Sequence, residues 1–187
     1  AVDAIRSGSH QYSPTWGHLP LREKLAEQYT ESLGWHVDPA LNVTITCGVT
    51  EAICSALLAL LNPGDQVLII EPSHENFIPA AIFAAAEPVA VTLQAPDYRL
   101  DYELLAEAIT PRSRVLLLNT PHNPTGRVFD TEEISSLIDL VLAHNLLVVT
   151  DEIYDQILYD GRQHHSPGAF EALRERTVTI GGLSKTF

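Results

Sequence analysis

Apolar residues return with a helical period in several stretches of the chain. Leu21, Leu25 and Tyr29 are four residues apart, so they line one face of an α-helix, and Gly34 is a favourable residue for ending it. This pattern predicts a helix over residues 21–33. Three further helices are predicted on the same grounds, over residues 50–61, 75–86 and 102–109.

Short apolar runs rich in β-branched residues lie between the helical stretches. They are expected to form strands over residues 43–47, 66–70, 89–93, 114–118, 146–150 and 177–180. Strands that are apolar on both faces and alternate with helices are typical of a parallel sheet covered on each side. The predicted fold class is therefore α/β, a three-layer αβα arrangement around a predominantly parallel sheet.

Asp130 and Glu133 mark the start of another helix, which runs to about His144. Their spacing matches a capping box, in which the two side chains bond free backbone N–H groups at the helix start. We interpret the acidic residues over 130–133 as a solvated helix start.

Composition narrows the class of protein. The chain has 187 residues, of which 45% are hydrophobic, enough for one globular core. A net charge of -13 disfavours a nucleic-acid partner, because such binding needs clustered Lys and Arg. No apolar run reaches the ~20 residues of a membrane-spanning helix, and no secretory signal pattern opens the chain. We therefore expect a cytoplasmic protein that binds neither nucleic acid nor membrane.

Two residue types bear on the protein's compartment and completeness. The only cysteines, Cys47 and Cys54, are interpreted as buried free thiols, which suits a reducing compartment. The chain has no methionine, so we expect it to be a piece of a longer protein.

Five polar or glycine-rich motifs follow the predicted strands. They are CGVTEA at 47–52, EPSHENF at 71–77, NTPHNPTG at 119–126, DEIY at 151–154 and GGLSK at 181–185. The carboxyl ends of parallel strands meet at one edge of a sheet, which is where such folds bind ligands. The sequence has neither Gly-x-Gly-x-x-Gly after a strand nor a Gly-Lys-Ser/Thr loop, so dinucleotide and P-loop sites are disfavoured.

The order of these motifs resembles the class I and II pyridoxal-phosphate-dependent aminotransferases of fold type I, from residue 11 to residue 187. The matching residues are Gly48-Val49-Thr50, Asn119-x-Pro121-x-Asn123-Pro124-Thr125-Gly126, Asp151-x-x-Tyr154 and Ser184-Lys185. Within that superfamily, PHNPTGRVF, YDGRQHHS and ERTVTIGGLSKTF are most similar to the branch of kynurenine aminotransferase, glutamine transaminase K and cysteine-S-conjugate β-lyase. The resemblance implies that residues 1–187 form most of the cofactor-binding large domain, with an N-terminal segment, the end of that domain and a C-terminal small domain outside them.

The resemblance assigns the catalytic roles to Lys185, Asp151 and Tyr154. Pyridoxal 5'-phosphate is held as a Schiff base, which requires an amine, and the other lysine, Lys24, lies on the polar face of the first predicted helix. Once the amino-acid substrate displaces it, the Lys185 amine can carry the Cα proton. Asp151 would keep the pyridine nitrogen protonated, because a nearby carboxylate raises the pKa of that nitrogen. Tyr154 and Asn123 would donate hydrogen bonds to the ring oxygen.

The resemblance also implies a phosphate site and a partner subunit. Gly48, Val49 and Thr50 lie where a helix starts, and helix N-termini bind anions. Ser184 is expected to contact the cofactor as well. Tyr12, in QYSPTWG, matches a family tyrosine that reaches the phosphate of the partner subunit, so a homodimer is implied.

The sequence departs from the family pattern at the site in two places. His74, with Phe77 nearby, stands where the family stacks an aromatic ring on the cofactor. A neutral imidazole can stack, whereas a charged one weakens the electron sink, which leaves an acid or base role open. Gly182 stands where the family has Ser or Thr, so one hydroxyl donor to the phosphate is missing. The family's phosphate and substrate-carboxylate arginines fall beyond the chain, so we expect the chain alone to be inactive.

The implied function is transfer of an amino group between an L-amino acid and a 2-oxo acid. Two alternatives remain open: a β-eliminating C–S lyase, which uses the same residues, and a non-catalytic aminotransferase-like domain that binds an effector. No metal site is predicted, because adjacent residues such as His164 and His165 point apart on regular structure.

Overall fold

The computed structural model describes residues 1–8 and 12–186, and the chain forms two compact units, Ala1–Thr46 and Cys47–Phe187. Over these described residues, no helix has both the length and the apolar character that crossing a bilayer requires.

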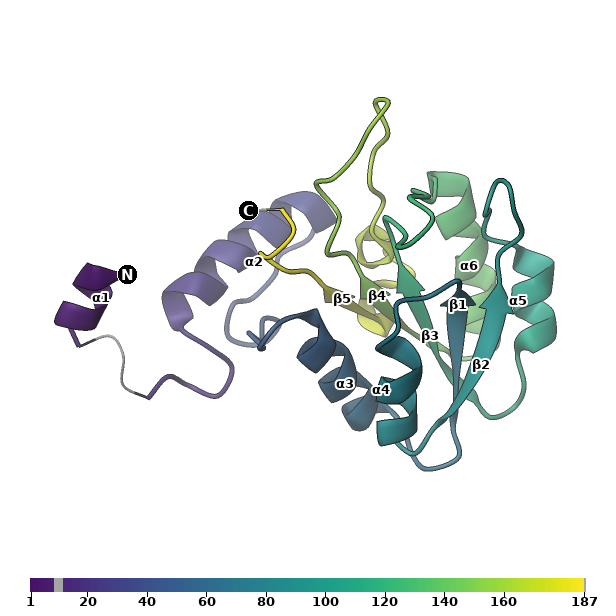
Figure 1. The fold of residues 1–187 in the computed structure, drawn as a ribbon, viewed down its shortest axis with the longest axis horizontal. Coiled ribbons are helices and arrows are strands. Elements are labelled where there is room, and N and C mark those ends of the chain that lie inside the picture. The colour runs from purple at the N-terminus through teal and green to yellow at the C-terminus, as the bar shows by residue number, and fades with distance from the viewer. Residues whose placement is uncertain (9–11, 187) are drawn as a thin grey trace. The chain divides into compact units, whose positions relative to one another are not determined.

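The first unit contains the helices α1 (Val2–Arg6) and α2 (Leu19–Leu33) (Figure 1). Helix α2 confirms the helix predicted over 21–33. It ends at Gly34, whose φ of 73° is left-handed, a conformation that glycine adopts without a Cβ penalty. The stop signal in the sequence therefore acted as predicted.

The strand predicted over residues 43–47 is wrong. Ile45 N donates to the Trp16 carbonyl oxygen at 2.8 Å, but the segment is assigned to no strand. A strand requires a run of such bonds to a neighbouring chain, and β-branched composition alone does not supply that partner.

The second unit is built on a five-stranded sheet with the order β2-β1-β3-β4-β5, in which every pairing is parallel (Figure 1). The strands are β1 (Gln66–Glu71), β2 (Glu87–Thr92), β3 (Ser113–Asn119), β4 (Leu147–Asp151) and β5 (Thr177–Ile180). They confirm five of the predicted strands and the predicted parallel sheet.

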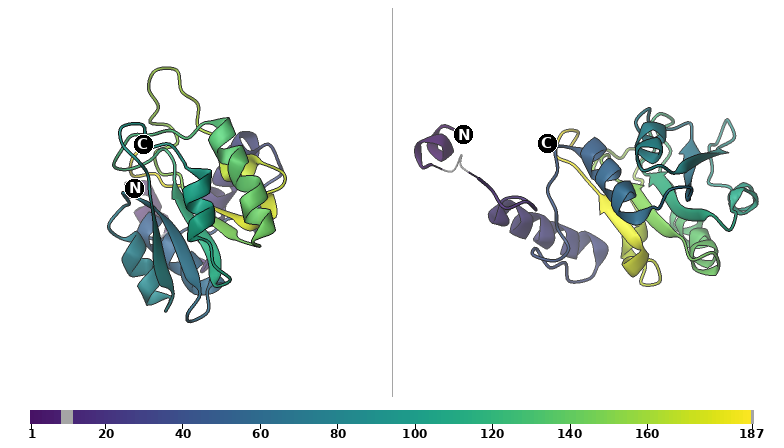
Figure 2. Two further views of the ribbon diagram at one scale, coloured as in Figure 1. Left: turned by 90° about the vertical axis from the view of Figure 1, so that its right-hand side faces the viewer. Right: turned by 90° about the horizontal axis from the view of Figure 1, so that it is seen from below.

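Helices lie on both faces of this sheet, as Figures 1 and 2 show. They are α3 (Val49–Leu60), α4 (Phe77–Phe83), α5 (Tyr102–Ala108) and α6 (Thr131–Ala143), with the short 3-10 turns η1 (Pro167–Ala169) and η2 (Arg174–Arg176) before β5. Successive strand residues point to opposite faces. Leu116 and Leu118 accordingly pack with α5 and α6, while Val115 and Leu117 pack with α3 and α4. Two apolar cores result, which confirms the three-layer αβα prediction.

The two cysteines are free, as predicted, but their expected burial is wrong. Cys47 is exposed and Cys54 is half-buried. Cys47 lies in the segment just before α3 rather than in a buried strand, so its side chain is not covered.

Candidate active site

The polar motifs gather at the carboxyl edge of the sheet. Four of them follow β1, β3, β4 and β5, and the register places Asn119 opposite Asp151 and Asp151 opposite Ile180. The ends of the three strands β3, β4 and β5 are therefore level. The motif at 47–52 follows an extended segment instead of the expected strand, and it opens α3.

Asp151, the last residue of β4, is a buried carboxylate with only 6% of its surface exposed. Burial raises its pKa from 3.8 to about 6. Two smaller effects oppose this rise, the Ile153 N–H that donates to Asp151 Oδ1 at 3.1 Å and the charge on His74, while the charge on Glu152 adds to it. The carboxylate is thus poorly satisfied by the protein alone.

Asn119, at the end of β3, ties the neighbouring motif to Asp151. Its Nδ2 donates to the Asp151 carbonyl oxygen at 2.9 Å, and its Oδ1 accepts from Asn123 N at 2.7 Å. Thr120 N donates to the same Asp151 carbonyl at 3.0 Å. Asn119 therefore fixes Asn123 relative to Asp151. Sequence reasoning placed Asn119 in the motif but gave it no role, although a buried amide that ends an apolar strand is a signal for one.

His122 supports the same loop from inside. It is 2% exposed, its Nδ1 lies 2.8 Å from Thr125 Oγ1, and its ring packs 5.9 Å from that of Phe129. Burial lowers its pKa to about 4, with the Pro72 carbonyl opposing the change, so the ring is neutral near pH 7. We therefore assign His122 a structural role in shaping the loop over residues 120–127, called the Asn123 loop below.

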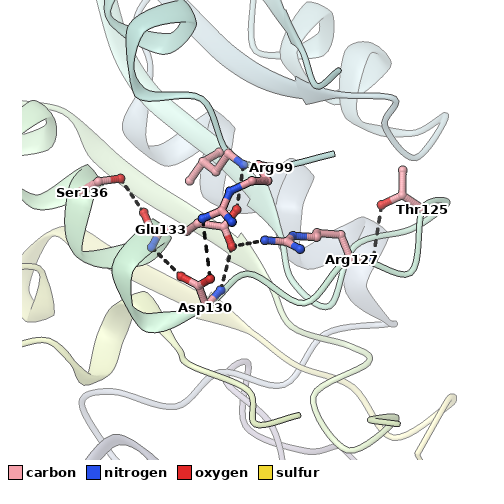
Figure 3. Close-up of polar contacts among 7 residues, drawn as sticks. Arg99, Thr125, Arg127, Asp130, Glu133 and Ser136 are labelled. Carbon is pink, nitrogen blue, oxygen red and sulfur yellow. Dashed lines mark hydrogen bonds and ion pairs between the residues drawn. The ribbon is translucent and has the colours of Figure 1, made fainter. Parts of the chain in front are cut away.

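The Asn123 loop is also held by the start of α6 (Figure 3). Asp130 and Glu133 form the predicted capping box. Glu133 is nevertheless buried, with 4% of its surface exposed, so the interpretation of a solvated helix start is wrong for this residue. Its Oε2 lies 2.6 Å from Arg127, and its Oε1 accepts from Leu100 N at 2.9 Å. The guanidinium of Arg127, the residue after the motif, pairs with this carboxylate, which would be costly to bury alone.

The amino end of α3 lies at the motif over residues 47–52. Gly48 has a φ of 84°, and a Cβ built there would meet no atom within 4 Å. No side chain caps the helix, and Glu51 turns back to accept from Cys47 N. The N–H groups of a helix start in this state can bind an anion.

His74 lies in the loop between β1 and α4, whose Asn76 joins it to α3. Asn76 N donates to His74 Nδ1 at 3.3 Å, and Asn76 Nδ2 donates to Thr50 Oγ1 at 3.1 Å. In the first bond, Nδ1 of His74 is the acceptor. The ring packs against Phe77 with centroids 5.9 Å apart. These contacts fix the position of the imidazole in this loop.

Gly182 brings the turn after β5 close to both β4 and α3. A Cβ on Gly182 would lie 2.9 Å from Ile153 Cδ1 and 3.3 Å from Val49 Cγ2. A side chain at this position would therefore require the Ile153 methyl to shift. Ser184 and Lys185 follow on an exposed turn, and Tyr154 is half-buried after β4. Tyr12 is fully exposed in the first unit.

Comparison with known proteins identifies the family. Residues 2–187 match the family model described as aminotransferase class I and II, so the chain belongs to this family. It is 39% identical to human kynurenine–oxoglutarate transaminase 1, covering 95% of the chain and 45% of that protein. It is 36% identical to aromatic-amino-acid aminotransferase 2 of Thermococcus litoralis, covering 100% of the chain and 48% of that protein.

Solved structures agree on the fold. N-succinyldiaminopimelate aminotransferase from Mycobacterium tuberculosis superposes with a TM-score of 0.96 at 40% identity, covering 100% of the chain and 49% of that structure. The sheet and its helices are therefore those of fold type I aminotransferases. The chain spans about half the length of the curated relatives it matches.

Proposed function

We propose that the chain is the large-domain part of an enzyme that transfers an amino group between an L-amino acid and a 2-oxo acid. Aminotransferases of this family depend on pyridoxal phosphate, whose protonated ring supplies an electron sink when it is bound. The proposal rests on the Asp151 carboxylate. It is buried, its pKa is raised to about 6, and within the described residues a single backbone N–H bonds it. A cationic N–H from a bound ring would satisfy it.

The surrounding residues fit the rest of that cofactor. The start of α3, which no side chain caps, would hold the phosphate through Gly48, Val49 and Thr50. Asn123, fixed through Asn119, and Tyr154 would donate to the ring oxygen. Lys185 lies on an exposed turn, and within the described residues its amine makes no ion pair. That amine would hold the cofactor covalently and then move the proton at the substrate Cα.

The decisive experiment locates the lysine that holds the cofactor in the full-length enzyme. Borohydride reduction fixes the cofactor to that lysine, and peptide mapping then finds it. We expect the label on Lys185 and none on Lys24, which is exposed and paired with Glu27 at 2.7 Å. Lys185→Ala should abolish labelling while Lys24→Ala should leave it unchanged. A label on Lys24 would refute the assignment.

The substrate branch is a further part of the proposal. We assign the enzyme to the kynurenine aminotransferase, glutamine transaminase K and cysteine-S-conjugate β-lyase branch on its motifs, although relatives of other specificities have comparable identity. Parallel assays with kynurenine, glutamine and a cysteine S-conjugate separate amino transfer from β-elimination. Pyridoxal phosphate bound without turnover of any amino acid would instead favour the non-catalytic effector domain.

We also propose a homodimer in which Tyr12 serves the partner's site. Its side chain is fully exposed, as a residue awaiting a partner would be. Sedimentation of the full-length enzyme tests the dimer. Tyr12→Phe should weaken cofactor retention without changing the oligomeric state.

A further inference from the structure

Glu152, the residue after Asp151, is a second buried carboxylate at the end of β4. Only 4% of its surface is exposed. Both of its oxygens are bonded, Oε2 to His164 Nε2 at 2.8 Å and Oε1 to the Ser166 hydroxyl at 2.7 Å. Burying a carboxylate is costly unless its oxygens are satisfied, so these two donors are what keep Glu152 inside.

The contacts of His164 define its proton position. Nε2 faces the Glu152 carboxylate and must donate, whereas Nδ1 is buried and has no hydrogen-bond partner within the described residues. The tautomer with its proton on Nε2 donates to Glu152 and places no N–H at the unpartnered Nδ1.

The same contacts close the loop that follows Asp151. Ser166 Oγ, while donating to Glu152, accepts from Gly168 N at 3.2 Å and so caps η1. Glu152 N donates to the Ile180 carbonyl oxygen at 2.7 Å, which continues the β4–β5 pairing by one residue. The base of the loop over residues 153–163 is thus tied by side chains on one side and by the sheet on the other.

The backbone of Asp151 is held by the neighbouring strands, but its carboxylate is not. Among the described residues, its carboxylate receives only the Ile153 N–H, while its carbonyl is bonded by Asn119 and Thr120. A rotation of the backbone at Glu152 would move the Ile153 N–H that bonds the Asp151 carboxylate, and so would release that carboxylate. The anchored Glu152 side chain opposes that rotation.

We propose that His164 and Ser166 are positioning residues that hold the Asp151 carboxylate in place by anchoring Glu152. The inference rests on the proposed function, in which Asp151 faces the pyridine nitrogen of the cofactor. A carboxylate displaced by a fraction of an ångström still folds, but it stabilises the nitrogen's proton less well.

The test uses full-length enzyme loaded with pyridoxal phosphate carrying nitrogen-15 in its ring, whose chemical shift reports protonation of that nitrogen. His164→Ala removes the donor, whereas His164→Gln places an amide N–H where Nε2 lies. His165→Ala is the matched control, because His165 makes no hydrogen bond or ion pair within the part of the chain described. The rate of the first half-reaction and the thermal midpoint of the cofactor-free protein are measured on the same preparations.

We expect His164→Ala to lower the pH at which the ring nitrogen loses its proton by about one unit and to slow the half-reaction about tenfold. His164→Gln should recover most of both losses, and His165→Ala should change neither. A purely structural role predicts a lower thermal midpoint with the nitrogen shift and the rate per loaded enzyme unchanged, and that outcome overturns the proposal.

A milder variant keeps the test open if His164→Ala does not fold. Ser166→Ala removes one of the two donors and should move the nitrogen shift in the same direction by a smaller amount. An unchanged shift in Ser166→Ala also overturns the proposal. Failure of the proposed function has a separate signature, since the unmodified enzyme would then hold no pyridoxal phosphate on Lys185.

Discussion

Two buried carboxylates of this chain, Glu133 at the start of α6 and Asp151 at the end of β4, lie in very different surroundings. Glu133 receives the backbone N–H groups of Leu100 and Asp130 and the guanidinium of Arg127. Asp151, nearly as buried, receives one N–H, from Ile153, and its pKa rises to about 6. The first carboxylate is fully satisfied within the protein, and the second is not.

The number of hydrogen-bond partners distinguishes a carboxylate with a structural role from one that can still bind a ligand. When a buried charge is paired and hydrogen-bonded, removal of either partner lowers the stability of the fold. A buried charge with few partners lowers stability and is retained where a ligand will complete it. Glu133 bonds Arg127 next to the Asn123 loop, whereas in the proposed function Asp151 faces a cation that the cofactor brings.

The largest effect is expected from Asp151→Asn on catalysis. The amide matches the carboxylate in size and can still accept from Ile153 N, so the fold and the bound cofactor should remain. Without the charge, the ring nitrogen loses its proton and the carbanionic transition state loses several kcal/mol of stabilisation. Single-turnover removal of the Cα proton in the full-length enzyme should slow by roughly 10²-fold or more.

Asp155→Asn is the control for that experiment. Asp155 lies four residues further along the chain and accepts a hydrogen bond from Gln156. The Asp155→Asn variant should react at the rate of the unmodified enzyme. An Asp151→Asn variant that also reacts at that rate would end the assignment of Asp151 to the cofactor nitrogen.

The second effect concerns stability at Glu133. Glu133→Ala leaves the Arg127 guanidinium and the Leu100 N–H without their partner, and breaking such a buried pair costs about 3 kcal/mol of unfolding free energy. Glu132→Ala, on the same helical turn but exposed, should cost less than about 0.5 kcal/mol. Chemical denaturation measures both. Equal losses in the two variants would mean that Glu133 acts only through the charge of the helix start.

Local patterns in the sequence predicted most of the fold, because β1 to β5 and α2 to α6 are each specified by their own residues. The segment 43–47 has strand composition and fails because a strand also needs a neighbour. The burial of Glu133 escaped prediction for a similar reason, since its partners Leu100 and Arg127 come from other segments. The motifs placed Asn123 and Asp151 at one edge, but the bonds through Asn119 that join them depend on register.

The third effect is a pH-dependent gain of stability in Asp151→Asn. The carboxyl pKa is 3.8 in ordinary surroundings and about 6 when folded, so between these values the folded state binds more protons than the unfolded state. The free energy of unfolding therefore falls as pH rises through this window. The shift of this pKa from 3.8 to about 6 corresponds to a loss of roughly 3 kcal/mol of unfolding free energy. A neutral amide should recover about 1–2 kcal/mol of this loss above pH 6 and none of it below pH 3.8.

Denaturation of the cofactor-free protein at several pH values checks this gain. The cofactor must be absent, because a cation beside Asp151 lowers its pKa again. A difference between Asp151→Asn and the unmodified protein that stays constant across the window would show that burial does not raise the pKa of this carboxyl.

The smallest effect tests how the turn that carries Lys185 packs on the end of β4. Gly182→Ala places a Cβ 2.9 Å from Ile153 Cδ1, which forces that methyl to move and should cost about 1 kcal/mol. Ile153→Val removes this methyl, so Gly182→Ala should cost clearly less in that background, although Val49 Cγ2 at 3.3 Å still limits the space. A double-mutant cycle of unfolding free energies measures the coupling, expected at about 0.5 kcal/mol or more. Additive losses would mean that Gly182 and Ile153 do not touch in solution, and the short distance that explains glycine at this position would then have to be abandoned.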